Sequence, residues 1–303
     1  MDHPRFVISA DEAQSMAKIS GLSVPQLLPT LVKSAQNLAR PPISNYHVAA
    51  VGLSSDGRIF IGVNLEFPGV PLHHSVHAEQ FLVTNHALHN SPRLAYIAVS
   101  AAPSDSNFSG PCGHCRQFFQ ELRQAGDIQI LITSETAQQG KKDVIYKPFS
   151  SLVPNSFGPC NLLDPEKPLI LENHNNGLCF ANGVGQDCDK LKHLALEAAN
   201  ASHAPYSDCP SGVALMDVNG KFYKGCYLES VAYTPSLSPV QAALVDFVAN
   251  GGGGYGEIVA AVVVEKEKAM VRQEDTARLL LKMVSPDCDF RVFHCCSSVD
   301  GCV

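Results

Sequence analysis

The sequence contains no tryptophan, and only 7% of its 303 residues are aromatic. It also lacks any run rich in lysine and arginine, and its formal net charge is −7. Proteins that hold a nucleic-acid strand need a basic groove and aromatic rings on which bases stack. The composition therefore argues against a nucleic acid or an anionic membrane surface as a partner.

Long hydrophobic stretches are missing as well. The longest unbroken apolar run is residues 258–264, whereas a membrane-spanning helix needs about 20 residues. The first residues, MDHPRFVISADE, lack the basic patch and apolar stretch of a secretory signal. The 11 cysteines are an odd number on a long chain, which argues against a complete disulfide framework and favours a reducing compartment. We predict a cytosolic protein without membrane contact.

Hydrophobic periodicity predicts the same order of elements in both halves of the chain: a helix, two strands, then alternating helices and strands. The expected helices cover 24–39, 76–89 and 112–124 in the first half, and 187–201, 239–249 and 275–283 in the second. The expected strands cover 46–53, 58–63, 94–101 and 128–133, and then 212–217, 221–228, 257–264 and 290–293. The chain therefore reads as a duplication.

Residue pairs support the duplication. DGRIFIG around Gly57 faces NGKFYKG around Gly220, 163 positions later, and Leu65-Glu66 recurs as Leu228-Glu229 at the same offset. Between the halves, residues 151–186 are rich in Pro, Asn and Gly, which predicts a long irregular connector.

Two short motifs in the first half carry chemistry. Cys112 and Cys115 stand three apart at the start of a predicted helix, so their sulfurs point the same way and the helix dipole favours the thiolate. His77, 35 residues earlier, begins another predicted helix and supplies a third ligand. Three protein ligands leave one tetrahedral position open, which is typical of catalytic zinc. Glu79 lies close enough to exchange protons with a zinc-bound water.

Each motif alone is weak evidence. A lone Cys-x-x-Cys is often redox-active or half of a structural zinc site, and a lone His-x-Glu is mostly chance. Found together and in order, each at a helix start, the motifs favour a catalytic zinc site. His-x-Glu followed by Pro-Cys-x-x-Cys is also the general signature of zinc deaminases.

Further motifs extend the pattern over nearly the whole chain. They are SNY at 44–46, NLEF at 64–67, VHAEQ at 76–80, PCGHCRQF at 111–118, PYS at 205–207 and PSGVAL at 210–215. With these residues the sequence resembles the two-domain, homodimeric cytidine deaminases of some bacteria and plants.

The resemblance implies an enzyme of pyrimidine salvage. Hydroxide on the zinc adds to C4 of cytidine or deoxycytidine, and uridine or deoxyuridine and ammonia are the products. It identifies His77, Cys112 and Cys115 as ligands of one zinc ion per chain and Glu79 as the proton shuttle.

The same resemblance implies the substrate contacts. Asn64 and Glu66 match a pair that binds the ribose 3'-hydroxyl, and the backbone at Ala78 holds the base. Tyr46 matches an aromatic residue packed on the base, and Phe157 matches one that reaches the partner subunit's site. For Tyr46 and Phe157, an ordinary core or interface role remains an equal alternative.

The implied fold is α/β: a three-layer α/β/α, cytidine-deaminase-like mixed sheet, present twice. We predict an N-terminal segment 1–22, a catalytic domain 23–150, a linker 151–186 and a non-catalytic domain 187–303. The expected assembly is a homodimer.

The second half lacks the chemistry. At the offset of 163, Asn64, His77 and Glu79 fall on Tyr227, Val240 and Ala242, and a slip of one residue gives Gln241 and Ala243. No Pro-Cys-x-x-Cys follows the strand 257–264. This half is predicted to be a degenerate copy in which Glu229 has a structural role.

Four other features are set aside. The tail residues His294, Cys295 and Cys296 with Cys302 are poor candidates for a second metal, because adjacent cysteines rarely share one ion and tails are easily disordered. The loop histidines 73 and 74 are expected to face solvent, and His114 to point away from the metal. The glycines at 251–254 lack the pattern of a phosphate loop.

Two competing functions remain. Deaminases of cytosine or adenine within RNA or DNA share the zinc motif, but acidity and few aromatics argue against a bound strand, and Glu66 would repel a 3'-phosphate. A binding protein with a purely structural zinc is the other alternative. Glu79 argues against it, because a structural site needs no acid/base partner.

Overall fold

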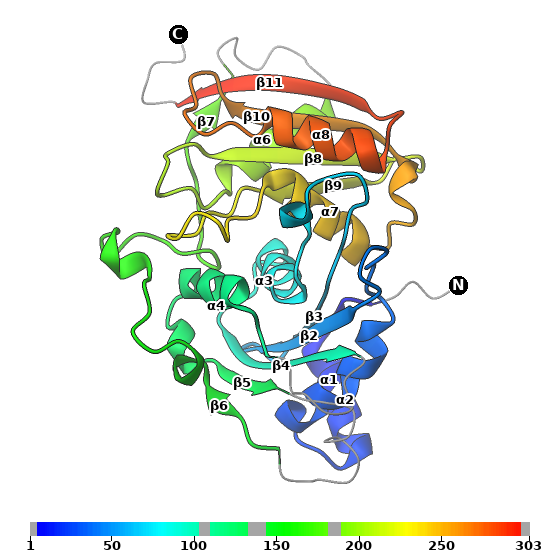
Figure 1. The fold of residues 1–303 in the computed structure, drawn as a ribbon, viewed down its shortest axis with the longest axis vertical. Coiled ribbons are helices and arrows are strands. Elements are labelled where there is room, and N and C mark those ends of the chain that lie inside the picture. Colours follow the sequence, from blue (N-terminus) through cyan, green and yellow to red (C-terminus); the bar gives the residue numbers. More distant parts are fainter. Residues whose placement is uncertain (1–4, 103–109, 133–143, 181–188, 298–303) are drawn as a thin grey trace. The chain divides into compact units, whose positions relative to one another are not determined.

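The computed structural model describes residues 5–102, 110–132, 144–180 and 189–297. The chain divides into two compact units (Figure 1). Unit 1 comprises the described residues through Phe67 together with Leu72–Pro159, and unit 2 comprises Pro68–Pro71 and the described residues from Cys160 onward. No helix in these ranges is long and apolar enough to cross a membrane.

Unit 1 is built on a six-stranded mixed sheet in the order β1-β3-β2-β4-β5-β6. The strands are β1 (Val7–Ile8), β2 (His47–Ser54), β3 (Ile59–Val63), β4 (Leu94–Ala102), β5 (Gln129–Ile132) and β6 (Lys147–Pro148). β2 pairs antiparallel with both β3 and β4, and β4 pairs parallel with β5. The parallel pair lies beside the strand hairpin, as the predicted order of elements requires.

Helices cover both faces of this sheet (Figure 1). They are α1 (Ala10–Ser20), α2 (Val24–Gln36), α3 (Ala78–Leu88) and α4 (Gly113–Phe118). A capping box starts α2, in which the Ser23 amide donates to Gln26 Oε1 at 2.9 Å. Hydrophobic periodicity did not predict α1, whose apolar face is narrow: only Ala13 and Ala17 are buried.

The predicted helix 112–124 is wrong in its second half. α4 ends at Phe118, and a short 3-10 turn, Phe119–Glu121, follows it. Leu122 is extended and Gln124 is left-handed with φ 56°, so the helix cannot continue. Cys115, Phe118, Phe119, Leu122 and Ala125 are buried at helical spacing although the chain leaves the helix, which explains why the pattern suggested a longer one.

Unit 2 repeats the arrangement with a five-stranded sheet in the order β7-β11-β10-β8-β9. Its strands are β7 (Leu178–Cys179), β8 (Ser211–Asp217), β9 (Phe222–Cys226), β10 (Ile258–Lys266) and β11 (Asp289–Ser297). Its helices are α6 (Lys190–Asn200), α7 (Pro239–Ala249) and α8 (Glu274–Val284). β8 is antiparallel to β9 and β10, and β10 is parallel to β11, so the duplicated fold is confirmed.

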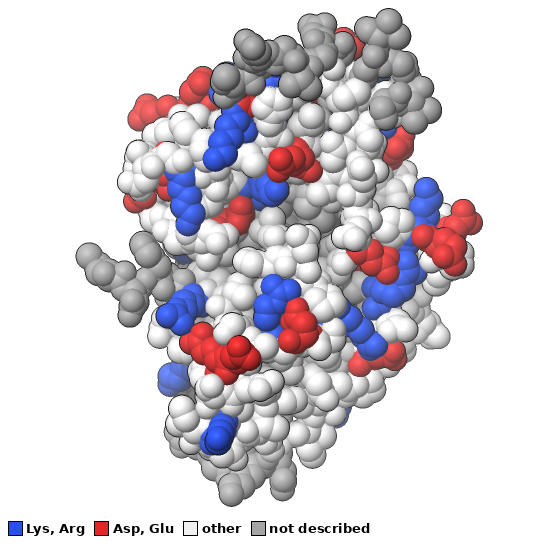
Figure 2. All heavy atoms as spheres, turned by 180° about the vertical axis from the view of Figure 1, so that it is seen from behind, with Lys and Arg blue, Asp and Glu red and all other residues white. Residues whose placement is uncertain are grey.

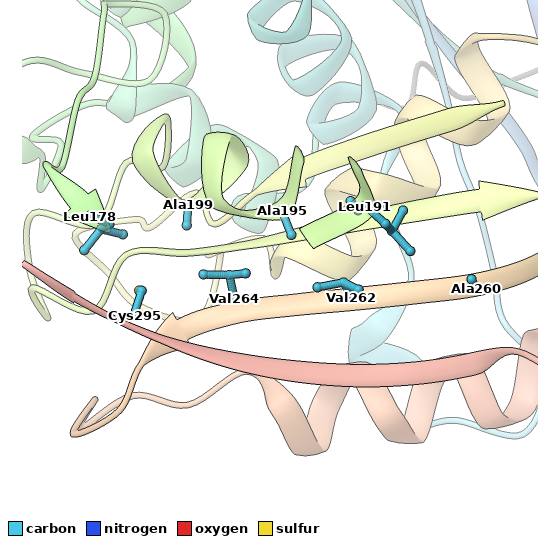
Figure 3. Close-up of a cluster of buried hydrophobic side chains, with 9 residues drawn as sticks. Leu178, Leu191, Ala195, Ala199, Ala260, Val262, Val264 and Cys295 are labelled. Carbon is cyan, nitrogen blue, oxygen red and sulfur yellow. The ribbon is translucent and has the colours of Figure 1, made fainter. Parts of the chain in front are cut away.

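The core of unit 2 lies between α6 and one face of its sheet (Figure 3). Leu191, Ala195 and Ala199 of α6 pack on Val262 and Val264 of β10. Small alanines allow the helix to approach closely, and the β-branched valines suit a buried strand. Burial of such side chains stabilises the unit by about 25 cal/mol per Å² of apolar surface.

A glycine in the second strand of each hairpin lets a helix lie directly on the sheet. A Cβ added to Gly62 would collide with the carbonyl oxygen of Ala78, and one added to Gly225 would collide with that of Pro239. Gly62 and Gly225 are 163 apart, whereas Ala78 and Pro239 are 161 apart. The offset between equivalent residues of the two copies therefore falls from 163 in the strand to 161 in the helix that follows.

This change of register corrects the sequence alignment of the two halves. A β-bridge joins Leu65 to Val76 in unit 1 and Leu228 to Leu237 in unit 2. The segment between the bridged residues is two residues shorter in unit 2. His77 thus corresponds to Ser238, and Val240, which the constant offset had paired with His77, instead corresponds to Glu79.

The tail is more ordered than expected. β11 continues through His294, Cys295 and Cys296 to Ser297, and Cys302 lies outside the described residues. Cys296 faces Cys179 of β7 in the antiparallel register, and a disulfide joins them. The other seven described cysteines are free. Disulfides are rare in reducing compartments, so the Cys179–Cys296 bond departs from the expectation of a reducing compartment.

Candidate metal centre and substrate cavity

Two helix starts bring the predicted ligands together. His77 is the N-cap of α3 and Cys112 the N-cap of α4, while Cys115 lies in the first turn of α4. His77 Nδ1 lies 3.4 Å from the sulfur of Cys112 and 3.3 Å from that of Cys115, and the two sulfurs are 3.7 Å apart. Residues 35 positions apart in sequence therefore form one cluster.

These distances fit a tetrahedral zinc site. With Zn–S about 2.3 Å and Zn–N about 2.0 Å, tetrahedral ligands lie about 3.8 Å apart for two sulfurs and about 3.5 Å apart for a sulfur and a nitrogen. One imidazole and two thiolates are also ligands that zinc prefers. The three side chains can hold zinc and leave its fourth position open.

The protonation of the cluster suits a cation. The hydrogen bond with Cys115 lowers the pKa of the Cys112 thiol to about 3, against the effect of burial. The same hydrogen bond and burial raise the pKa of Cys115 well above its ordinary value. The hydrogen bond between the His77 ring and Cys112 raises the pKa of His77. The cluster thus has one thiolate ready and a second that a bound cation would deprotonate.

Glu79 lies beside the cluster and makes a side-chain hydrogen bond with Cys115. Its side chain is 5% exposed, and burial raises the pKa of its carboxyl above the ordinary value. It is not one of the three clustered ligands. A carboxyl that is buried next to a metal centre and holds its proton more tightly than usual is suited to acid/base catalysis.

A cavity of about 560 Å³ in unit 1 opens onto the cluster. It is lined by Ile43, Ser44, Tyr46, Val48, Asn64, Leu65, Glu66, Leu72, Ser75, Val76, His77, Ala78, Glu79, Val99, Gly110 and Cys112. Most of these side chains are apolar, with a few polar groups among them, as in small-molecule sites. The size suits one nucleoside.

Asn64 and Glu66 both line this cavity, and the side chain of each is hydrogen-bonded to backbone groups. The Asn64 amide donates to the Tyr46 carbonyl at 2.8 Å and accepts from the Val48 amide at 2.9 Å. Burial raises the pKa of Glu66, but hydrogen bonds from Ser44 and Ile43 outweigh it and leave the pKa below the ordinary value. Glu66 is therefore ionised, an acceptor facing the cavity.

The remaining predicted contacts divide into two groups. Tyr46 and Ala78 line the cavity, with Tyr46 37% exposed. Phe157 is not among the lining residues; it is 46% exposed, and its carbonyl accepts from the Gln117 side chain at 2.8 Å. An exposed phenylalanine held in place by a helix next to the metal cluster is compatible with a contact to another subunit.

The predictions for the nearby histidines need correction in one case. His74 is 9% exposed and its ring lies 4.3 Å from that of His73, so His74 does not face solvent as expected. His114 is outside the ligand cluster, as expected, but its ring lies 5.3 Å from that of His77. Local sequence could not show this contact, because the two histidines come from different helices.

Sequence reasoning missed two residues that hold the site. Arg116 donates to the Pro111 carbonyl at 2.7 Å, directly before Cys112, and to the Leu152 carbonyl at 3.1 Å. It thereby fixes the loop that carries the first cysteine. Ser44 is the other missed residue, and its recurrence as Ser207 was the available signal.

Unit 2 has no such cluster at the corresponding position among its described residues. The helix caps equivalent to His77 and Cys112 are Ser238 and Gln273. Tyr227, the counterpart of Asn64, is 8% exposed and makes side-chain hydrogen bonds with Ser236 and Gln273. A buried tyrosine thus stands in unit 2 where unit 1 has the cavity-lining Asn64.

A second group of metal-compatible side chains lies elsewhere in unit 2. It consists of Glu265, Glu274 and His294. The Arg272 guanidinium pairs with Glu265 at 3.4 Å and lies 3.4 Å from His294 Nε2. Arginine thus supplies the positive charge that the buried carboxylate requires.

Comparisons with known proteins agree with the duplication. Residues 23–131 and residues 149–278 each match a family model described as the cytidine and deoxycytidylate deaminase zinc-binding region. Cytidine deaminase 1 of Arabidopsis thaliana is 56% identical over 306 residues, which cover 97% of this chain and 99% of that protein. The chain belongs to the cytidine and deoxycytidylate deaminase family.

Two other members of the deaminase family are instructive. Probable inactive cytidine deaminase 4 of Arabidopsis thaliana is 40% identical over 96% of this chain and 96% of its own length. Among solved structures, cytidine deaminase of Burkholderia pseudomallei is 30% identical and covers 43% of this chain and 96% of its own, with a TM-score of 0.36. Family membership alone therefore does not show whether a chain is catalytically active. The residues of the candidate metal centre must decide that.

Proposed function

We propose that the protein is a zinc-dependent hydrolase that converts cytidine and deoxycytidine to uridine and deoxyuridine with release of ammonia. The observation that carries the proposal is the cluster of His77, Cys112 and Cys115 at the end of a nucleoside-sized cavity, with buried Glu79 beside it. Family membership supports the same reaction. Its place is the salvage of pyrimidine nucleosides.

Glu79 is the residue that moves protons in this proposal. When bound, zinc makes a coordinated water acidic enough to ionise near neutral pH. Glu79 accepts the proton of the attacking water and delivers it to N3 of the cytosine ring. It then takes the proton of the new C4 hydroxyl and passes it to the amine, which leaves as ammonia while the C4 carbonyl forms. Burial, which raises the pKa of Glu79, lets one carboxyl serve as base and then as acid.

Asn64, Glu66 and Tyr46 bind the nucleoside in this proposal. Ionised Glu66 accepts from the ribose 3'-hydroxyl and Asn64 contacts the same hydroxyl, while the backbone at Ala78 holds the base. Tyr46 forms an aromatic wall of the cavity. The 3'-hydroxyl is free in a nucleoside but carries phosphate in a strand, so an ionised Glu66 favours the nucleoside.

A cytosolic homodimer completes the proposal, with Phe157 contributing to the partner subunit's site. The exposed position of Phe157 supports it. Unit 2 serves as a scaffold without its own metal. On the face drawn in Figure 2, Lys and Arg side chains are interspersed with Asp and Glu. The described residues on that face form no basic groove for a nucleic acid.

A single assay tests the proposal. Purified protein is given cytidine, cytidine monophosphate or a short cytosine-containing RNA, and the absorbance change on deamination is followed while metal is measured on the same sample. We expect turnover of cytidine alone and about one zinc per chain. Bound zinc without turnover of any substrate would instead favour the structural-metal alternative.

A further inference from the structure

The loop before β2 in unit 1 recurs in unit 2 with the same hydrogen bonds. The amides of Ile43 and Ser44 donate to Glu66 Oε2, each at 2.9 Å, and the Ser44 hydroxyl donates to Glu66 Oε1 at 2.5 Å. In unit 2 the amides of Tyr206 and Ser207 donate to Glu229 Oε2 at 2.9 and 3.2 Å, and the Ser207 hydroxyl donates to Glu229 Oε1. Each carboxylate is held by its loop at three points.

The backbone of the two loops is also the same. Asn45 and Asp208, which follow the serines, are both left-handed, with φ 53° and 52°. The Ser44 hydroxyl accepts from the Tyr46 amide at 3.0 Å. The Ser207 hydroxyl accepts from the Cys209 amide at 3.1 Å. A single serine side chain thus joins the carboxylate to the far end of the loop in both units.

Unit 2 serves as an internal control for the role of this serine. It has no metal cluster at the corresponding position in its described part, and Tyr227 stands where unit 1 has Asn64. The serine–glutamate arrangement persists there without the metal-compatible cluster. It is therefore a means of holding the loop, and the hydroxyl of Ser44, whose one proton is given to Glu66, has none left to donate to a ligand.

A count of the acceptor positions of Glu66 shows how many remain available to a ligand. A carboxylate has about four acceptor positions, two on each oxygen. At Glu66 the loop occupies both positions on Oε2 and one on Oε1. One acceptor position on Oε1 remains for a ligand in the cavity, and Ser44 fixes its direction.

We propose that Ser44 is a positioning residue for sugar binding, acting through Glu66 and through the backbone of Tyr46. The inference rests on the proposed function, in which Glu66 accepts from the ribose 3'-hydroxyl. The reacting end of the cavity, at His77 and Glu79, does not depend on this loop. Loss of the Ser44 hydroxyl therefore weakens substrate binding and leaves the chemical step intact.

The experiment compares Ser44→Ala, Ser44→Thr and Ser207→Ala, with cytidine and its analogue lacking the 3'-hydroxyl as substrates. For Ser44→Ala we expect the KM for cytidine to rise about tenfold and kcat to stay within twofold, because a hydrogen bond to a charged group is lost. Ser44→Thr keeps the hydroxyl and restores the KM. Ser207→Ala removes the matching bond in unit 2 and leaves both constants unchanged.

With the analogue that lacks the 3'-hydroxyl, Ser44→Ala should raise the KM less than about threefold, since the contact that Ser44 orients is absent.

The outcomes separate this inference from the proposed function. Glu66→Gln with an unchanged KM for cytidine would overturn the proposed sugar contact itself. A raised KM in Glu66→Gln with an unchanged KM in Ser44→Ala would overturn the role of Ser44 alone. Equal effects of Ser44→Ala on both substrates would also overturn it, because the serine would then act through general disorder of the loop. Thermal unfolding of each variant shows that it is folded.

Discussion

Ser238 occupies in unit 2 the helix N-cap that His77 occupies in unit 1. The His77 amide donates to Gln80 Oε1 at 3.3 Å, and the Ser238 amide donates to Gln241 Oε1 at 3.1 Å. Both caps are extended, with ψ 153°. Serine is a strong N-cap, so unit 2 has a good cap where unit 1 has the proposed metal ligand. The same helix start serves stability in one copy and ligand placement in the other.

Replacing His77 by the residue of unit 2 should separate these two roles. We expect His77→Ser to retain helix α3, because serine caps it, but to lose zinc and all measurable turnover. Metal analysis and circular dichroism check both parts. Ser238→Ala is the control and should keep about one zinc per chain while losing about 1 kcal/mol of stability. A His77→Ser protein that still bound one zinc per chain would contradict the assignment.

Glu79→Gln should abolish catalysis without removing the metal. The amide nearly matches the shape of the carboxyl but cannot accept and return a proton, so kcat should fall by about 10²- to 10⁴-fold. Zinc content should remain at about one per chain, since Glu79 is not a ligand. Turnover at the original rate with zinc bound would show that another group moves the proton.

The Cys179–Cys296 disulfide should stabilise unit 2. It closes a loop between residues 117 apart, which restricts the unfolded chain. We expect a Cys179→Ser, Cys296→Ser double variant to have a Tm lower by about 5 °C or more. Cys288→Ser, which removes a free thiol, is the control. Peptide mapping of the unreduced protein should find Cys179 linked to Cys296, and alkylation of both in that sample would refute the link.

His86 should make unit 1 sensitive to acid. Burial lowers its pKa to about 3 from 6.5, and neither ring nitrogen has a hydrogen-bond partner among the described residues. The titratable groups that interact with it are Asp56, Arg58 and His89, and its ring packs 4.7 Å from that of Phe60.

Because the folded pKa of His86 is depressed, the unfolded chain binds the proton first as pH falls. The contribution of neutral His86 to the free energy of unfolding is complete above pH 6.5 and is lost as the pH falls toward 3. The loss is at most about 1.4 kcal/mol per pH unit. Urea unfolding at about pH 7.5, 6 and 5 should show a shallower loss of stability in His86→Leu than in the natural protein. Parallel curves for the two proteins would count against this account.

Local signals in the sequence were enough for much of the fold and for the three residues that the structure clusters at the candidate metal centre. Apolar residues that recur at helical or strand spacing act over a few positions, so they can be recognised without knowledge of neighbours in space. His77 and the two cysteines stand at helix starts, where direction follows from backbone geometry. Tertiary burial has no such local signal, as the early end of α4 and the buried His74 show.

The sequence by itself determined the duplicated order of elements, the set of metal-binding residue types and the degenerate second copy. Only the tertiary structure decided that Ser238 stands in the place of His77, because two residues are missing from a loop and hydrogen bonds across the sheet set the register. It also decided that Glu66 is held by Ser44 and that Cys296 meets Cys179. Such contacts join residues far apart in the chain, and their pairing depends on packing that no local pattern encodes.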